Sequence, residues 1–100
     1  MTTLTLETEP IANQVTVTDE KLIVDLADGR TISVPLRWYP RLAHASPAER
    51  QKWQLIGDGY GIEWSDLDEH IGIEGLLAGR RSGESKRSLD RWLATRKTSI

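Results

Sequence analysis

The run Asp66-Leu67-Asp68-Glu69-His70 gathers the most potentially reactive side chains in the chain. It places three carboxylates and an imidazole within five residues, and carboxylate oxygens are the ligands that hard divalent cations prefer. The spacing lacks the central glycine and the distal glutamate of a calcium-binding loop. Because charged runs usually face water, we predict an acidic solvated turn and no metal site. A metal-dependent enzyme built on Asp66, Asp68, Glu69 and His70 is the last-ranked alternative.

Two further patterns bear on catalysis, and neither predicts it. Gly57-Asp58-Gly59-Tyr60-Gly61 is similar to a phosphate-binding loop, but the strand pattern Ile62–Trp64 follows it where such a loop needs a helix. A hairpin turn is the better interpretation. His44 and His70 have no Gly-x-Ser-x-Gly nucleophile motif to accompany them. We therefore predict a protein that is not an enzyme, with no catalytic residues and no cofactor.

Trp38-Tyr39-Pro40-Arg41 is a candidate contact surface for a partner. Two adjacent aromatic residues that leave a strand cannot both point into one core, so at least one ring is expected at the surface. Tryptophan, tyrosine and arginine are the residue types enriched at binding hot spots. Trp38, Tyr39 and Arg41 are thus predicted partner-binding residues. The alternative is that both rings pack beneath the following helix.

Alternating apolar residues predict a three-stranded antiparallel meander in the first third of the chain. Period-two repeats give each strand one buried face: Val15 and Val17, then Leu22, Val24 and Leu26, then Ile32, Val34 and Leu36. Asp28-Gly29 joins the last two strands, because glycine accepts the positive φ of a tight primed turn. Pro35 cannot donate to a ladder, so it places the end of the third strand at an edge or exit.

The middle of the chain predicts one short helix and further short strands. Ser46-Pro47-Ala48-Glu49 is a capping box with proline at the first helical position, and the helix is expected from about Pro47 to Gln54. Strand patterns follow at Leu55-Ile56, at Ile62–Trp64, and at Ile71 with Ile73. The predicted fold is α+β: a small antiparallel sheet (meander plus hairpin), a short capped helix and a C-terminal amphipathic helix.

Length and composition limit the classes of protein that fit. One hundred residues form one core. The absence of cysteine excludes disulfides and thiolate metal sites, and fits a reducing compartment. The N-terminus Met-Thr-Thr-Leu-Thr-Leu-Glu has neither the basic residues nor the apolar run of a signal peptide, and no segment is apolar for long enough to span a bilayer. We predict a cytoplasmic protein with no membrane association.

Charge divides the chain into an acidic body and a basic tail. Residues 1–79 carry 6 Lys/Arg and 13 Asp/Glu, a net charge of −7, whereas residues 80–100 carry 7 Lys/Arg and 2 Asp/Glu, a net charge of +5. We take 1–79 as the α+β body and 80–100 as a basic linker and helix. Such an asymmetry is typical of a tail that binds nucleic acid or an acidic partner. Docking of the tail on its own body is an equal alternative.

The tail predicts a short amphipathic helix after a linker at residues 80–85. Ser88 is the expected cap, and Leu89, Trp92 and Leu93 follow at i, i+3 and i+4 spacing on one face. A helix of about ten residues is marginal alone in water, so it needs a surface. Its own body, a second copy or a partner can provide one.

The chain resembles a bacterial family catalogued as domain of unknown function 2442. The resemblance rests on Asp28-Gly29-Arg30, Ile32–Leu36, Trp38–Leu42, Ser46-Pro47 through Trp53, Gly61–Trp64, Leu67–Glu69, Ile71, Gly75–Gly79 and Arg91-Trp92-Leu93. It implies a small α+β domain with an antiparallel sheet. It also implies an antitoxin-like role, since such proteins are often encoded beside a second small protein. His70 stands where the resemblance leads us to expect an acid, and the tail is too short for the helix-turn-helix that some relatives carry.

Three functional hypotheses follow. The first is a non-enzymatic interaction protein, antitoxin-like, that binds a small toxin-like partner protein through its basic C-terminal helix; its predicted contacts are Trp38, Tyr39, Arg41, Leu89, Arg91, Trp92 and Leu93. The alternative is a nucleic-acid-binding or autoregulatory protein that uses Arg80, Arg81, Lys86, Arg87, Arg91, Arg96 and Lys97. The third is a structural domain with no catalytic site. A homodimer is compatible with each of them.

Overall fold

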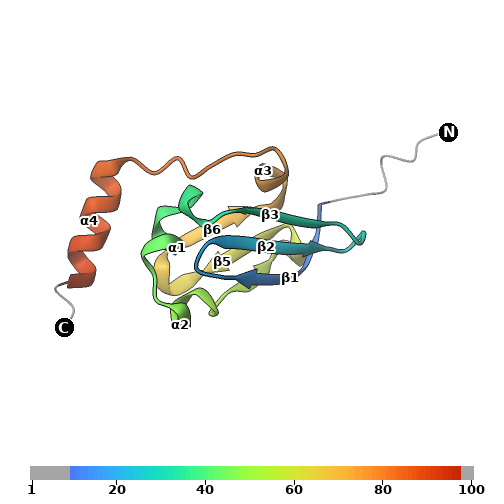
Figure 1. The fold of residues 1–100 in the computed structure, drawn as a ribbon, viewed down its shortest axis with the longest axis horizontal. Coiled ribbons are helices and arrows are strands. Elements are labelled where there is room, and N and C mark those ends of the chain that lie inside the picture. Colours follow the sequence, from blue (N-terminus) through green and yellow to red (C-terminus); the bar gives the residue numbers. More distant parts are fainter. Residues whose placement is uncertain (1–9, 98–100) are drawn as a thin grey trace.

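Two antiparallel sheets of three strands each form the body of the protein (Figure 1). The computed structural model describes residues 10–97, and the N-terminal stretch considered above as a signal peptide lies outside them. The first sheet contains β1 (Ala12–Val17), β2 (Lys21–Leu26) and β3 (Thr31–Pro35), and the second contains β4 (Gln54–Ile56), β5 (Gly61–Trp64) and β6 (Glu69–Gly72). The predicted α+β class is confirmed.

Short helical segments connect the strands. The α-helices are α1 (Pro40–His44), α2 (Pro47–Arg50), α3 (Ile73–Leu77) and α4 (Lys86–Lys97), and single 3₁₀ turns are η2 (Leu36–Trp38), η3 (Gly57–Gly59) and η4 (Ser65–Leu67). Within residues 10–97, no helix has the length and apolar character needed to cross a membrane.

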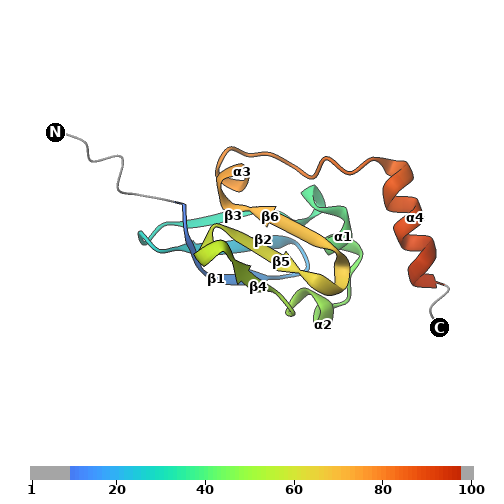
Figure 2. The ribbon, with the colours of Figure 1, turned by 180° about the vertical axis from the view of Figure 1, so that it is seen from behind.

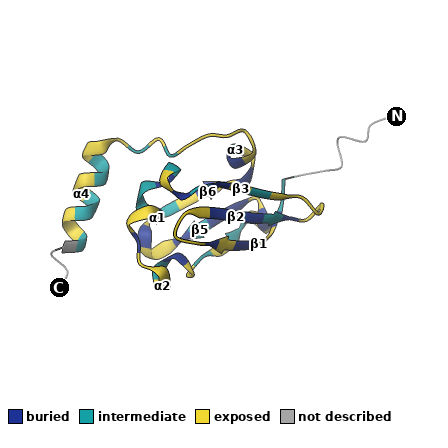
Figure 3. Cartoon of the chain, in the orientation of Figure 1, coloured by how far each residue is buried: buried dark blue, intermediate teal, exposed yellow. Residues whose placement is uncertain are grey.

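One hydrophobic core lies between the two sheets (Figure 3). In the first sheet Val24 pairs with Val15 on one side and with Ile32 on the other, which puts the predicted apolar residues on one face. In the second sheet Ile62 pairs with Ile71. The largest completely buried side chains come from both sheets and from the connecting turns: Trp64, Leu22, Leu36, Leu42, Ile62, Leu67, Ile73 and Val24.

The capping box is present, but the helix it starts is shorter than predicted. The Ser46 hydroxyl accepts the Glu49 N–H at 3.1 Å, and the Ser46 N–H donates to the Glu49 carboxylate at 2.8 Å. However, α2 ends at Arg50 rather than Gln54. The buried Trp64 indole donates to the Arg50 carbonyl at 3.0 Å, and it takes the place of the next helical N–H. The chain then turns into β4.

Three other predicted boundaries were wrong. The third strand ends at Pro35, and Leu36 is buried from the 3₁₀ turn η2. Ile73 does not extend a strand: its N–H donates to the Tyr60 carbonyl at 2.9 Å, and α3 begins at Ile73 itself. The last helix starts at Lys86, so Ser88 is its third residue and not its cap.

The C-terminal helix α4 stands at the end of the body that carries α1 and α2, and an extended segment joins it to α3 (Figures 1 and 2). We use "linker" for residues 80–85 of this segment. Gly79, in the left-handed conformation (φ +77°), ends α3 and turns the chain into the linker. The linker runs back along the body, so that α4 and α1 become neighbours although they are separated by more than 40 residues in the sequence.

Candidate functional site

Arg41 of α1 is the main anchor between the body and the linker. Its Nε donates to the Glu84 carboxylate at 2.9 Å, and its Nη2 lies 2.6 Å from the same group. Its Nη1 donates to the carbonyls of Leu67 and Asp68 at 3.1 and 3.2 Å. The Arg41 and Glu84 side chains are only 14% and 10% exposed. The guanidinium therefore lowers the pKa of Glu84. The two side chains form a bidentate salt bridge that fixes the linker to the body.

Trp92 is the side chain of α4 that packs against the hydrophobic core, and two guanidinium groups lie over its ring. The Cζ atoms of Arg41 and Arg96 are 5.1 and 4.6 Å from the ring centroid, which is cation–π distance. Arg96 in turn donates to Glu49 of α2 at 2.7 Å. The hydrogen bonds from Arg96 and from the Ser46 N–H lower the pKa of Glu49 to about 2.

The start of α4 is built from linker residues. The Ser85 hydroxyl accepts the Ser88 N–H at 3.1 Å, so Ser85 performs the capping role predicted for Ser88. Ser88 instead donates its hydroxyl to Glu84 at 2.7 Å, which connects the helix to the Arg41 anchor. The helix thereby acquires a fixed starting point without a cap from the body.

The linker covers the aromatic surface predicted from Trp38 and Tyr39. The Tyr39 ring is buried, and its hydroxyl donates to the Arg80 carbonyl at 2.9 Å. Trp38 is half-buried beneath Arg81, whose Cζ is 4.8 Å from the ring centroid. The Ser82 N–H donates to the Trp38 carbonyl at 3.0 Å. The aromatic pair therefore lies against the chain's own linker, with neither ring standing free.

Both leucines of the predicted stripe on α4 are half-buried, as is Trp92. Unlike Trp92, Leu89 and Leu93 do not belong to the half-buried residues that pack on the core. Their apolar surface is thus only partly covered by the body. This leaves a short apolar strip at the edge of the interface between α4 and the body.

The basic residues of the tail fall into two groups. Lys86 forms an ion pair with Asp90 at 2.8 Å within α4, and Arg96 pairs with Glu49, so part of the positive charge is already matched. Arg87 and Arg91 are exposed, and no acidic group lies within ion-pair distance of them among residues 10–97. The side chain of Lys97 lies outside the described part. Among the described side chains of α4, Arg87 and Arg91 are therefore the cations without an acidic partner.

The acidic run is divided by the fold. Asp66 lies in η4, 3.7 Å from Lys52, and Asp68 ends that turn, 3.6 Å from Arg41. His70 is exposed on β6, whereas Glu69 is half-buried. In the part of the chain that the structure describes, no three histidine or acidic side chains come together as metal ligands would. The run thus contributes separate contacts and one partly buried carboxyl group.

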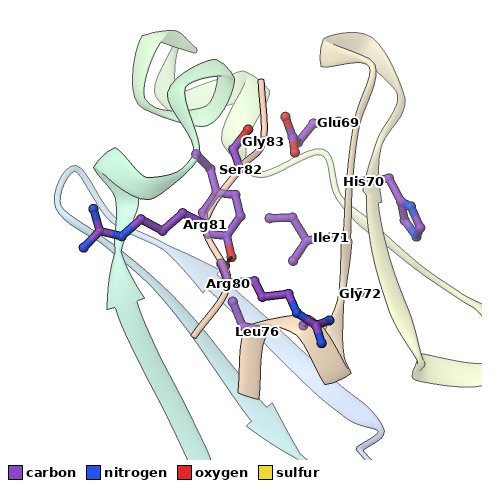
Figure 4. A pocket seen from close by; sticks show the side chains of 11 residues that line it. Glu69, His70, Ile71, Gly72, Leu76, Arg80, Arg81, Ser82 and Gly83 are labelled. Carbon is purple, nitrogen blue, oxygen red and sulfur yellow. Dashed lines mark hydrogen bonds between the residues drawn. The ribbon is translucent and has the colours of Figure 1, made fainter. Parts of the chain in front are cut away.

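A hollow of about 220 Å³ lies between β6 and the linker (Figure 4). Glu69, His70, Ile71 and Gly72 line one side, and the linker residues 80–83 line the other. Burial raises the pKa of Glu69 to about 7, and the charges of Glu84 and Asp68 act in the same direction against that of Arg41. At neutral pH this carboxyl group therefore exists in both its protonated and its ionised form.

Of the site residues predicted from sequence, Arg41, Trp92 and Arg96 come together at one end of the body. Glu49 and Glu84 complete that group and were not predicted. Each acid pairs with an arginine of the other segment. Glu49 of the body pairs with Arg96 of the tail, and Glu84 of the tail pairs with Arg41 of the body. The charge division between body and tail was the available signal, but it does not say which acid meets which base.

Two solved structures have folds similar to that of this chain. A chain of unknown function from Rhodospirillum rubrum, whose crystal structure is known, is 32% identical with a TM-score of 0.65; the match covers 79% of this chain and 95% of that one. An uncharacterized protein from Chromobacterium violaceum, solved by solution NMR, is 21% identical with a TM-score of 0.62, covers 90% of this chain and 79% of that one, and shows the fold alone.

No curated protein matches the sequence. The family described as "Protein of unknown function (DUF2442)" matches residues 12–82, from the first strand to the middle of the linker. The helix α4 lies beyond the residues that the family model matches. The chain is a member of the DUF2442 family.

Proposed function

We propose that this protein is a non-enzymatic interaction protein whose helix α4 binds an acidic partner protein. The observation that carries the proposal is the apolar strip of Leu89 and Leu93, which the body covers only in part. Arg87 and Arg91 lie on the same helix without an acidic partner among the described residues. Apolar anchors provide affinity in helix recognition, and surrounding charges provide orientation and association rate. An antitoxin-like role, with a small toxin as the partner, is the concrete form of this proposal.

The position of α4 relative to the family supports the same interpretation. The family model covers residues 12–82, which contain both sheets and end before α4, and we propose that this region is the scaffold that presents the helix. A helix of 12 residues is marginal alone in water. Here it is held by Trp92, which packs against the core, and by the side chains of Arg41 and Glu49. A helix held in this way keeps its outer surface available for a partner.

The test is capture of a partner by the tagged full-length chain, followed by titration of the recovered protein. Leu93→Ala should weaken binding by about tenfold or more, because apolar anchors dominate helix recognition. Leu77→Ala is the matched control: Leu77 is an exposed leucine of α3, 39% accessible, far from α4. Equal affinity of both variants would contradict the proposal.

Nucleic acid is the alternative partner, and the same experiment distinguishes it. Binding through phosphates falls steeply between low and moderate salt and depends on Arg87 and Arg91 rather than on Leu93. Of the seven Lys and Arg residues of the tail, Lys86 forms an ion pair with Asp90 and Arg96 with Glu49, and the body is acidic. These observations favour an acidic protein as the partner.

A further inference from the structure

The linker is held closed over the hollow by a small set of contacts. Two hydrogen bonds connect it to the aromatic pair, from the Tyr39 hydroxyl to the Arg80 carbonyl and from the Ser82 N–H to the Trp38 carbonyl. The ion pair between Arg41 and Glu84 fixes its far end. Arg81 also lies over the Trp38 ring, and α4 has its own contacts with the body through Trp92 and Arg96, so opening must break these contacts as well.

Two features of the closed position oppose this stabilisation. The indole Nε1 of Trp38 is buried and has no hydrogen-bond partner among residues 10–97. A buried N–H without a partner is unfavourable, because it has lost its hydrogen bond to water. The second feature is Glu69, whose carboxyl group is half-buried and points toward Ser82 and Gly83 of the linker (Figure 4). Burial of an ionised carboxylate without a dedicated cation is unfavourable.

The charges that face Glu69 do not provide that cation. Arg41 reaches it from α1, but this guanidinium is already bound to Glu84 and to two carbonyls. Asp68, at the end of η4, and Glu84, in the linker, add negative charge. Tyr39, His70, Arg80 and Arg81 also line the hollow. In Figure 4 the guanidinium groups of Arg80 and Arg81 point away from Glu69. An ionised Glu69 therefore shares one arginine with two other carboxylates.

We propose that the linker is a proton-sensitive latch, which closes over the hollow when Glu69 is protonated and opens to release α4 when Glu69 is ionised. The biological role of the released helix rests on the proposed function, because release uncovers its apolar strip for a partner. The latch itself needs no partner. Its failure and the failure of the proposed function are therefore distinguishable.

The direction of the pH dependence follows from the two states of Glu69. In the closed state its pKa is about 7, and opening returns the group to water and its pKa toward the ordinary value of 4.5. The closed state thus binds more protons between these values. Closure is favoured at low pH, and this preference is lost as pH rises from about 4.5 through about 7. Between pH 5 and pH 7 the ratio of closed to open molecules should fall by at most about fortyfold.

The experiment is NMR on the full-length chain without a partner. Heteronuclear ¹⁵N NOE values of amides 80–97 report whether the linker and α4 are held against the body. In the unmodified protein these values should be high at pH 5 and fall at pH 7, while those of β2 and β5 stay high at both. Unchanged values for residues 80–97 would overturn the proposal.

Two variants assign the effect to Glu69. Glu69→Gln keeps the size of the side chain and cannot ionise, so its linker should remain ordered at both pH values. His70→Gln is the matched control, because imidazoles in general titrate in this range and His70 lines the same hollow. It should retain the response of the unmodified protein. Loss of the response in His70→Gln, or its persistence in Glu69→Gln, would refute the role of Glu69.

Folding of the variants is checked in the same spectra. Amide signals of β1 to β6 that keep their dispersion show that the body is intact. Glu84→Gln provides a second test, because it weakens the Arg41 anchor directly; it also removes the Glu84 charge, which raises the pKa of Glu69. Its linker should be more mobile than that of the unmodified protein already at pH 5. Equal order in the two proteins at pH 5 would contradict a latch that depends on this anchor.

Discussion

Replacing Glu49 with glutamine isolates the contact that holds the end of α4. One Glu49 oxygen accepts both the Ser46 N–H, at 2.8 Å, and a hydrogen of Arg96, at 2.7 Å. Glutamine keeps an amide oxygen that can still accept from Ser46, so the cap of α2 is retained. The substitution removes the charge and with it the ion pair to Arg96. Any loss of stability therefore measures the pair rather than the cap.

The pKa of Glu49 sets an upper limit on the stability that Glu49→Gln should lose. A fall from 4.5 to about 2 corresponds to at most about 3.4 kcal/mol of interaction. The side chains of Arg96 and Glu49 remain 30% and 26% exposed, so solvent screens the pair, and part of the effect belongs to Ser46. We expect Glu49→Gln to lower the free energy of unfolding by about 1 kcal/mol at pH 7. This corresponds to a melting temperature about 4–8 °C lower.

The sign of the pH dependence supplies the decisive measurement. The pKa of Glu49 is lower in the folded state than in the unfolded state, so its contribution is fully present above pH 4.5 and is lost as pH falls through about 2. Urea unfolding gives the free energy of unfolding of the unmodified protein and of Glu49→Gln at pH 7, 4 and 2.5. The difference between the two proteins should shrink toward zero as the pH falls. A difference of the same size at all three pH values would refute the electrostatic origin assigned to it.

Two further substitutions test the body by urea unfolding. Arg50→Ala should cost about 3 kcal/mol, because the buried Arg50 donates to the Leu42 and Ala43 carbonyls at 2.9 and 3.0 Å; a loss under 1 kcal/mol would contradict this. Gly59→Ala should cost at least about 2 kcal/mol, because a Cβ there lies 2.5 Å from Ile11 Cγ2 and 2.9 Å from the Ala12 carbonyl oxygen. Gly29→Ala, with a similar positive φ and open space, should cost only about 1 kcal/mol, and equal costs would show that the close approach is irrelevant.

The sequence predicted the features that depend on neighbouring residues. Alternation identified the strands β1, β2 and β3, and Asp28-Gly29 lies in the turn between β2 and β3. The turn is not the predicted primed type: the Gly29 N–H donates to the Leu26 carbonyl, and of the two residues only Gly29 (φ +98°) has a positive φ. The capping box at Ser46 also depends on contacts within four residues. Such signals are local, so a single sequence contains all the information that they need.

The predictions were wrong or incomplete where a residue distant in the sequence determines the local structure. Nothing near Arg50 indicates that the Trp64 indole will take its carbonyl and end α2. Packing of Tyr39 was one of the two alternatives considered, but the sequence did not show that its hydroxyl donates to the Arg80 carbonyl, 41 residues later. The amphipathic pattern of α4 predicted a helix but not the surface on which it rests. These contacts are set by tertiary packing, and the order of residues within one segment does not encode them.

The placement of α4 on the body is more specific than the division between an acidic body and a basic tail would require. If net charge alone held the basic tail on the acidic body, the helix could lie in either direction. The two anchors have opposite polarity: the body provides a cation, Arg41, for the acid that precedes α4, and an acid, Glu49, for the cation near its end. Reversing the helix would bring Glu84 toward Glu49 and Arg96 toward Arg41, which are like-charge pairs. The opposite polarity of the Arg41–Glu84 and Glu49–Arg96 pairs therefore favours one direction for α4. It also holds Trp92 between Arg41 and Arg96.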